Sequence, residues 1–387
     1  MRGRWGQRFL QAAALTTFLV LGGLTIFLFR EGLPALSKTP FEGIVFAVHP
    51  DNPVSTLTAA QVRALVRQEK RWQDFNGPDT VLIPIYLANI ERYVPPTASI
   101  QEIRLILDSL AEFPGILFAL PPALLPSSVK QLRVEWEGWK EIFFSTQWSP
   151  TYEPVPAVGF LPLLVGSLWV SIIGLAVVVP LGLAMAIYVV EFLPKSFYYP
   201  IKILWELLAG LPSVVVGFWG LVVVVPWIQK VFRLTAGETA LTAGILLGWM
   251  TLPLMASLVE EALRAIPRLL EESSYGLGAT QWQTIWRLKL PYVFPSIATA
   301  TLLSAGRILG ETMVVLMVSG NSPLLHFSPL QPVRTLPATL AAELGEAPVG
   351  SYHYHVLFLL GVILFILTLG LNLSAYLIHP KDAQAAR

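Results

Sequence analysis

The sequence has no cysteine and unusually little charge. None of its 387 residues is a cysteine, which excludes disulfides, thiolate metal sites and cysteine nucleophiles. Charged residues make up 13% of the chain, whereas soluble domains carry about 25%. So few charges cannot cover a water-facing surface of this size, and 54% of the residues are hydrophobic. The composition therefore predicts an integral membrane protein.

The sequence also lacks the motifs of several functional classes. It has five histidines and no HExxH pair, so a histidine metal site has no support. It has no GxxxxGK[ST] loop, so this chain cannot cradle nucleotide phosphates itself. The formal net charge of +1 creates no field that would attract nucleic acid. We therefore expect no bound metal or cofactor, no nucleic-acid partner and no enzymatic activity in this chain.

Six long apolar stretches are predicted to cross the membrane. Each is long enough, at ~1.5 Å per residue, to span a bilayer core of about 30 Å. They are residues 9–29, 160–190, 201–228, 239–258, 291–318 and 354–378. The first has no clear small-residue cleavage site, so we interpret it as a retained helix. Pro180, Pro212 and Pro253 predict bends in the second, third and fourth stretches.

The distribution of basic residues predicts the orientation. Six spans place both ends of the chain on one side of the membrane. That side also carries Arg2, Arg4, Arg8, Lys195, Lys202, Arg264, Arg268, Arg287, Lys289, Lys381 and Arg387. The opposite short loops carry only Lys230, Arg233 and Arg334. Because basic loops stay in the cytoplasm, both termini are predicted to be cytoplasmic.

The predicted organisation follows from this topology. It consists of a tail and first membrane helix at 1–30, an external segment at 31–158, a membrane domain at 159–380 with a cytoplasmic loop at 258–291, and a cytoplasmic tail at 381–387. The fold class is thus mainly α, with six transmembrane helices.

The external segment has its own predicted structure. Strand-like runs lie at 43–48 and 80–85, and helical patterns lie at 57–65 and 99–110. Thr58 and Gln61 have the spacing of a capping box at the start of the first helix. Alternating strands and helices predict a small α/β module.

The loop 258–291 has a distinctive pattern. An acidic pair opens a short amphipathic stretch, a glycine follows, and the stretch closes on Leu-Lys-Leu-Pro. This arrangement resembles the EAA loop of ABC importer permeases, with two serines in place of its two alanines. The resemblance implies that the loop docks into a separate ATPase and transmits its movement. The implied coupling residues are Glu271, Glu272, Gly278, Ala279, Leu288, Leu290 and Pro291. The alternative is an ordinary amphipathic loop.

Two charges lie inside the fifth apolar stretch. Arg307 and Glu311 are four residues apart, so they share one helix face and can pair. Charge at membrane depth costs about 2.5–3.5 kcal/mol per residue, and such residues usually serve a pathway. A guanidinium offers five donors in a planar fork, which suits an oxyanion. The alternative is a structural ion pair without substrate contact.

Longer segments resemble the phosphate permeases of the PstC type. They are ELLAGLPSVVVGF at 206–218 and GETM at 310–313 followed by Ser-Gly-Asn at 319–321; Val314 stands where that family commonly has alanine. The resemblance implies a type I ABC importer fold, and a permease for inorganic phosphate in the cell inner membrane. It implies a PstA-type second permease, an ABC ATPase dimer and an external phosphate-binding protein as partners.

The same resemblance assigns residue roles. It implies that Arg307, Glu311 and Thr312 lie on the translocation route. A moving helix also needs a hinge, which we expect at Gly210 and Pro212; a plain helix kink is the simpler interpretation of these two residues.

The external segment resembles one lobe of a phosphate-binding protein. The matching sequence segments include His49-Pro50-Asp51-Asn52-Pro53 and Phe113-Pro114-Gly115. Those proteins hold phosphate at a Ser-Gly-Thr-type helix start after the second strand, but residues 86–93 here lack the Ser-Gly pair. Our hypothesis is a degenerate lobe that docks a partner or covers the entrance. A purely structural cap is the alternative.

Three rival functions remain at this point. One is an importer for another oxyanion such as molybdate or sulfate, because an arginine alone does not discriminate. Another is a membrane-anchored phosphate sensor, against which the missing kinase or cyclase domain counts. The third is an intramembrane enzyme, for which the sequence offers neither a GxSxG nor an HExxH site.

Overall fold

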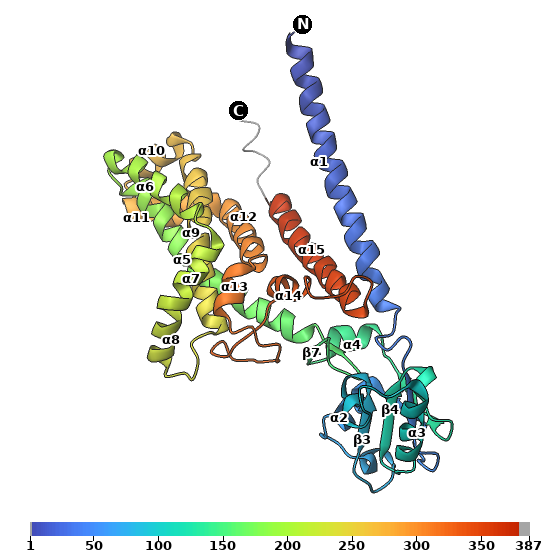
Figure 1. The fold of residues 1–387 in the computed structure, drawn as a ribbon. Coiled ribbons are helices and arrows are strands. Elements are labelled where there is room, and N and C mark those ends of the chain that lie inside the picture. Colours follow the sequence, from blue (N-terminus) through green and yellow to red (C-terminus); the bar gives the residue numbers. More distant parts are fainter. Residues whose placement is uncertain (1, 379–387) are drawn as a thin grey trace. The chain divides into compact units, whose positions relative to one another are not determined.

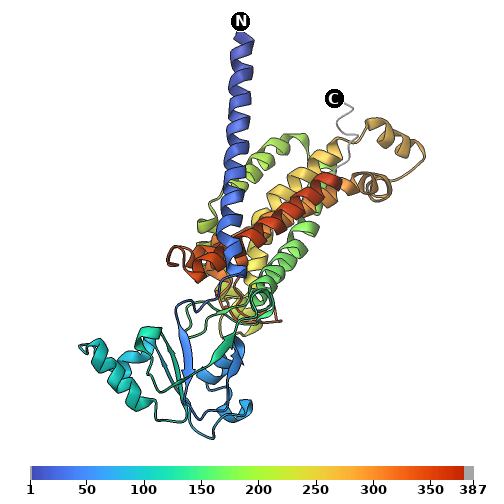
Figure 2. The same ribbon diagram turned by 90° about the vertical axis from the view of Figure 1, so that its right-hand side faces the viewer.

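The computed structural model describes residues 2–378, with side chains from residue 11 onward. The side chains of Arg2, Arg4 and Arg8 and the predicted tail 381–387 lie outside the described residues. Contacts divide the chain into two units, which are treated separately below. One unit runs to Phe160 and includes Ala347–Leu359, and the other comprises Leu161–Glu346 and the chain from Leu360 onward. Figures 1 and 2 show the elements of both units.

Six helical segments are long and apolar enough to cross a membrane, as predicted. They are Gln11–Leu36, Leu161–Glu191, Ser213–Phe232, Ala240–Arg264, Gln281–Leu309 and Tyr352–Ile378. The number of spans and the mainly α-helical class are thereby confirmed.

Two predicted spans are wrong in extent because the helix breaks inside them. The stretch 201–228 is divided by Gly210–Pro212, where α6 (Lys195–Ala209) ends and α7 (Ser213–Trp219) begins. Pro212 has no backbone N–H and disfavours helical geometry at the residue before it. The stretch 291–318 is divided after α12 (Leu290–Leu309), and α13 (Met313–Val318) follows as a separate helix.

The first unit contains a mixed four-stranded sheet. Its order is β3-β4-β1-β5, with β3 (Ile83–Tyr86) parallel to β4 (Ile116–Leu120). Strand β1 (Val45–Val48) is antiparallel to β4 and pairs Phe46 with Ala119. The fourth strand, β5 (Lys130–Gln131), lies at the edge beyond β1.

Two helices cover opposite faces of this sheet. Leu117 and Ala119 of β4 pack with residues of α2 (Ala59–Val66), whereas Ile116 and Phe118 pack with residues of α3 (Ile100–Leu110). Figure 1 shows the two helices on either side of β4. Strand β4 is therefore buried on both faces, which explains why it is a continuous apolar run. The α/β character expected for this segment is what the structure shows.

Sequence signals located the helix starts well. Thr58 accepts a hydrogen bond from the Gln61 N–H, and the Gln61 Oε1 accepts one from the Thr58 N–H at 2.8 Å, so the predicted capping box is confirmed. Ser99 and Glu102 form a second capping box at the start of α3.

The remaining elements of this unit are α1 (Arg2–Gly32), η1 (Leu33–Leu36), β2 (Thr56–Thr58), η2 (Trp72–Phe75), η3 (Leu87–Arg92), η4 (Pro122–Leu124), β6 (Arg133–Glu135), α4 (Trp139–Phe144), β7 (Trp148–Ser149) and β8 (Ala157–Val158).

The end of α1 is held by the beginning of α15 (Tyr352–Ile378). The His355 Nδ1 lies 2.8 Å from the Glu31 carbonyl oxygen, and its Nε2 lies 3.1 Å from the Lys38 Nζ. A Cβ on Gly32 would lie 2.8 Å from the Leu359 nitrogen, so a glycine is required at this close approach.

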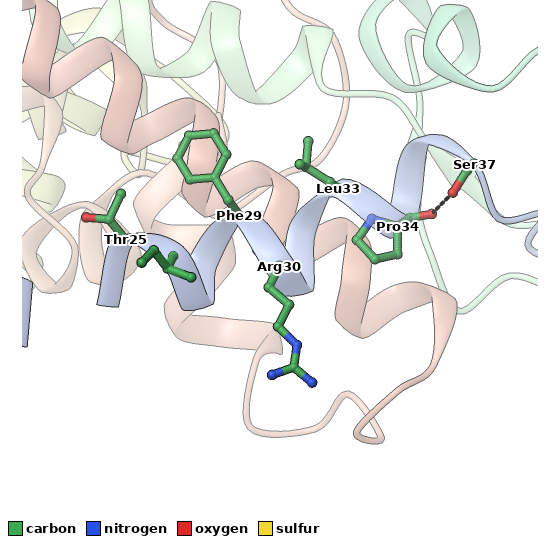
Figure 3. A pocket seen from close by; sticks show the side chains of 7 residues that line it. Thr25, Phe29, Arg30, Leu33, Pro34 and Ser37 are labelled. Carbon is green, nitrogen blue, oxygen red and sulfur yellow. Dashed lines mark hydrogen bonds between the residues drawn. The ribbon is translucent and has the colours of Figure 1, made fainter. Parts of the chain in front are cut away.

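Another face of the same end is open. A hollow of about 610 Å³ runs along it, lined from Thr25 to Ser37 (Figure 3). In Figure 3, Arg30 projects away from Phe29 and Leu33. Because a single helical segment supplies the whole lining, this hollow is a helix surface and not an enclosed site.

The second unit is built around α5 (Leu161–Glu191) and α9 (Ala240–Arg264). Glycines allow these two helices to approach closely: a Cβ on Gly244 would lie 2.6 Å from the Ile173 Cβ. Helix α12 completes the core through Val293, Ala300 and Ile308. The remaining elements are η5 (Gly220–Val224), α8 (Val225–Phe232), α10 (Arg268–Gly276), α11 (Gln281–Thr284), η6 (Ile285–Lys289) and α14 (Leu336–Glu343); η5 and η6 are π-helical.

Candidate functional site

The predicted coupling loop consists of two short helices joined by a tight turn. Helix α10 ends at Gly276, and α11 begins after Thr280, which forms a capping box with Gln283. Between them Gly278 has φ +83°, a left-handed conformation that side-chain-bearing residues rarely adopt. Nothing lies within 4 Å of a Cβ placed on Gly278. The glycine is therefore required by its backbone conformation and not by lack of space.

A buried lysine holds this loop against the membrane helices. The Lys289 Nζ donates hydrogen bonds to the Glu191 Oε1 at 2.7 Å and to the Glu271 Oε1 at 2.8 Å. The Lys289 and Glu191 side chains are each only 5% exposed. Glu191 ends α5, Glu271 lies in α10, and Lys289 immediately precedes α12. These three residues, the Lys289 clamp, connect the loop to two core helices.

Further hydrogen bonds reinforce the clamp. The Gln281 Nε2 donates to the Glu191 carbonyl at 3.2 Å, and the Ser274 and Thr284 hydroxyls lie 2.9 Å apart. Ser274 takes the place of an alanine in the EAA pattern, and its hydroxyl joins α10 to α11. The two helices of the loop are therefore fixed to each other as well as to α5.

The predicted coupling residues fall into two sets. Glu272 and Gly278 are exposed on the loop, next to Leu277, which is 90% exposed. Leu290 is buried, Ala279 and Leu288 are half-buried, and Glu271 is engaged in the Lys289 clamp. Pro291 is exposed in the first turn of α12. The loop thus has an outer surface that could meet a partner and an inner surface that meets α5 and α12.

Arg307 and Glu311 do not form the predicted pair. Helix α12 ends at Leu309, and the Glu311 N–H bonds to the Ile308 carbonyl at 3.2 Å, so the helical i to i+4 geometry is lost. Among residues 11–378, no hydrogen bond or ion pair engages the Arg307 guanidinium, which is exposed. Glu311 and Thr312 are half-buried just beyond the break. The pairing prediction is therefore wrong, and Arg307 is left with its donors available.

The expected hinge lies at the break between α6 and α7. The Gly210 N–H bonds to the Glu206 carbonyl at 3.1 Å, and helical bonding resumes with the Val215 N–H and the Pro212 carbonyl at 3.0 Å. Gly210 has φ −84°, so its conformation does not require glycine. Pro212 alone accounts for the break.

The Ser-Gly-Asn sequence after α13 forms a left-handed turn. Gly320 has φ +77° and Asn321 has φ +46°. A Cβ on Gly320 would lie 2.7 Å from the Pro332 Cβ, so both conformation and space require glycine there. The Arg334 Nε donates to the Asn321 Oδ1 at 2.9 Å, and its Nη1 contacts Glu343 of α14.

Sequence reasoning missed the importance of two buried charges. The sequence marks Lys289 as a basic residue at the end of the loop, and nothing in it pairs Lys289 with Glu191, which is 98 residues away. Glu260, 1% exposed, accepts hydrogen bonds from the Arg264 Nε at 2.7 Å and the Tyr198 hydroxyl at 2.8 Å. The i to i+4 spacing of Glu260 and Arg264 was a signal that could have identified that pair.

The chain is similar to known transport permeases. The Bacillus subtilis "probable ABC transporter permease protein YqgH" is 37% identical over 228 residues, which are 59% of this chain and 74% of that protein. The "phosphate transport system permease protein PstC" of Mesorhizobium japonicum is 34% identical over 270 residues, covering 64% of this chain and 82% of that protein. A solved bacterial alginate ABC transporter is 18% identical with a TM-score of 0.45, covering 64% and 83% of the two chains.

The family match covers the elements described above. The profile of the family described as "binding-protein-dependent transport system inner membrane component" matches residues 178–381, which is more than half of the chain. The matched range includes the clamped loop, α12 and the turn after α13. This chain therefore belongs to the family of binding-protein-dependent transport system inner membrane components.

Proposed function

We propose that this chain is a permease subunit of an ATP-driven importer of inorganic phosphate. The observation that carries the proposal is the loop 268–284, which is exposed on one side and clamped to α5 and α12 on the other. Such a loop suits a part that receives movement from a separate motor. The cargo is inferred from the relatives described as phosphate transport permeases PstC.

The proposal includes a topology and a set of partners. Both termini and the loop lie in the cytoplasm, and residues 31–158 lie outside. A PstA-type permease completes the pathway, an ABC ATPase dimer drives it, and an external phosphate-binding protein delivers the ion. ATP hydrolysis then belongs to a partner chain, in keeping with the absence of a phosphate-binding loop motif here.

The mechanism assigns a role to each part of the site. The ATPase contacts the outer surface of the loop at Glu272 and Leu277. The Lys289 clamp passes the movement to α5 and α12, because a buried, doubly paired ammonium resists displacement. Arg307 then offers its donors to phosphate, and nearby Glu311 prevents binding too tight for release.

A reconstituted transporter tests the proposal. The chain and its proposed partners are placed in liposomes, and ATP-dependent uptake of labelled phosphate is compared for wild type and Arg307→Gln. We expect uptake to fall in the variant, and excess sulfate or molybdate not to compete. Equal uptake by the variant would remove Arg307 from the pathway, and competition by molybdate or sulfate would favour the rival oxyanion importer.

The α/β segment is proposed to dock a partner or cover the entrance without holding phosphate. In support, the Ala88 N–H at the start of η3 donates to the Glu153 Oε2 at 3.2 Å. The resemblance to binding proteins would place the phosphate at this helix start. Here the Glu153 carboxylate of the chain itself accepts the hydrogen bond from the Ala88 N–H. Calorimetric titration of phosphate into the purified full-length Arg307→Gln chain should give no binding; micromolar binding would contradict this proposal.

A further inference from the structure

The second unit contains an apolar pocket beside the break between α6 and α7. Its volume is about 610 Å³, and its walls come from α5, α6, α7, α9 and Leu211 of the break. Every lining side chain is aliphatic, methionine, proline or tryptophan, and Trp219 stacks on Trp249 with ring centroids 6.2 Å apart. Apolar walls offer water no hydrogen bonds and accept apolar ligands. The chemistry of the walls therefore selects a hydrocarbon.

The pocket opens onto the surface of this unit. Its lining residues Leu208, Val215 and Trp249 are 44%, 54% and 55% exposed. Three of its walls, α5, α7 and α9, belong to membrane-crossing segments. A hydrocarbon chain can therefore enter the pocket from the bilayer.

A polar cluster lies next to the pocket along the same two helices. Helices α6 and α9 run antiparallel here: Tyr198 bonds to Glu260, Trp205 packs with Ala256, and Leu208 and Pro253 share the pocket wall. Lys202 precedes Leu208 by six residues, or about 9 Å of helix. The cluster of Tyr198, Lys202, Glu260 and Arg264 thus lies about one to three turns from the pocket, since Lys202 is three residues from Trp205 and Arg264 is eleven from Pro253.

This cluster has unused hydrogen-bond donors. The Arg264 Nε donates to Glu260, but no hydrogen bond engages its Nη atoms among the described side chains, and its side chain is 44% exposed. The Lys202 Nζ makes one hydrogen bond, to the Tyr198 hydroxyl at 3.4 Å, and is 35% exposed. Glu260 and the nearby Glu261 balance the two cations. A nearly neutral cluster with spare N–H groups suits a singly charged phosphodiester better than a free phosphate dianion.

Helix α6 has the character of a helix at the membrane interface. Its apolar side chains Phe197, Tyr199, Ile203 and Leu207 are 56–73% exposed, yet it is not among the membrane-crossing segments. Amphipathic helices with lysines and exposed aromatic residues lie at the depth of lipid headgroups. A helix at this depth would hold Lys202 level with the phosphodiester groups of the lipids.

We propose that α6 and α9 bind one phospholipid, with its phosphate on Arg264 and Lys202 and an acyl chain in the pocket beside Gly210–Pro212. The lipid fills the space against which α6 and α7 would move at their break. Its presence therefore stiffens that break. The proposal does not depend on the identity of the transported ion.

Brominated phospholipids test the site in the complete transporter. The complex is reconstituted in vesicles that contain a minor fraction of brominated phosphatidylglycerol, which quenches tryptophan on contact. We expect quenching above that set by the bulk lipid fraction. The excess should disappear in a Trp205→Phe, Trp219→Phe, Trp249→Phe variant, because these three indoles line the pocket. Absence of excess quenching in wild type would overturn the proposal.

Charge variants test the headgroup contact. Arg264→Gln combined with Lys202→Gln should lower the excess quenching, whereas Lys195→Gln, exposed at the start of the same helix, should not. Equal quenching in the double variant would overturn the assignment of the phosphate to these residues. A Val216→Phe variant tests the acyl-chain site separately, because its larger side chain fills the pocket and leaves Lys202 and Arg264 unchanged. It should also reduce the excess quenching. Undiminished quenching there would place the acyl chain elsewhere.

Discussion

Two sets of charged side chains in the second unit, the Lys289 clamp and Arg307 with Glu311, differ in one respect. In the Lys289 clamp the ammonium and the Glu191 carboxylate are buried, Glu271 is 35% exposed, and both carboxylates lie within 2.8 Å of the ammonium. Arg307 and Glu311 lie beside a helix break and do not pair with each other. Buried paired charges hold parts of a protein in place, whereas an arginine with free donors at membrane depth is suited to a ligand. Under the proposed function, the comparison separates residues expected to transmit movement from residues expected to meet the cargo.

Breaking the clamp is expected to have the largest effect. Lys289→Met leaves Glu191 and Glu271 without their cation, and removing one partner of a buried pair costs about 3–5 kcal/mol. We expect a lower melting temperature and loss of phosphate uptake while the partner ATPase still hydrolyses ATP. Thermal unfolding and the ratio of ATP hydrolysed to phosphate imported measure the two effects.

A conservative variant distinguishes transmission from simple destabilisation. Lys289→Arg keeps the cation and should restore a large part of both stability and coupling. If Lys289→Met imported phosphate normally, the clamp would have no part in transmission. If Lys289→Arg recovered stability but not uptake, the geometry of the ammonium would matter as well as its charge.

Gly278→Ala should have the next largest effect. The left-handed conformation of Gly278 costs about 1–2 kcal/mol for any other residue, so the turn between α10 and α11 would shift. We expect the coupling ratio to fall while the clamp keeps the fold stable. Gly276→Ala is the matched control, because Gly276 is two residues away, has nothing within 4 Å and is not left-handed. Equal coupling ratios in the two variants would remove the turn from the mechanism.

Local signals in the sequence predicted much of the fold. Long apolar runs gave the six spans, and the Thr58–Gln61 capping box located a helix start within a residue. These features depend on neighbouring residues alone. The breaks at Gly210–Pro212 and after Leu309 were less visible, because apolar composition continues across both.

The sequence predicted those parts of the candidate site whose residues lie close together along the chain. Gly278 could be identified because the turn it requires lies within the loop pattern. The clamp could not be predicted, since Lys289 and Glu191 meet only after α5 and α12 have packed. The expected pairing of Arg307 with Glu311 failed for a related reason: it assumed a continuous helix, and the chain turns at Gly310.

Arg307→Gln should lower phosphate uptake and leave the stability of the fold nearly unchanged. Because no partner is lost, stability should change by no more than about 0.5 kcal/mol. Uptake should fall by about tenfold or more, since hydrogen bonds to a charged group are worth about 1.5–3 kcal/mol. Melting temperature and uptake are measured together, with exposed Arg104→Gln in α3 as the control for charge removal. A large loss of stability would mean that Arg307 has a structural partner.

The smallest expected effect concerns the coupling between Arg307 and Glu311. A double-mutant cycle with Arg307→Gln and Glu311→Gln on thermal stability should give an interaction energy below about 0.5 kcal/mol, because the helix break prevents contact. The same cycle with Glu260→Gln and Arg264→Gln is the matched control: this pair has the same spacing, but α9 is continuous and the Arg264 Nε lies 2.7 Å from the Glu260 Oε1. A larger coupling is expected there. Should the two cycles give equal energies, Arg307 and Glu311 would be a structural pair, and the distinction between clamped and free charges would fail.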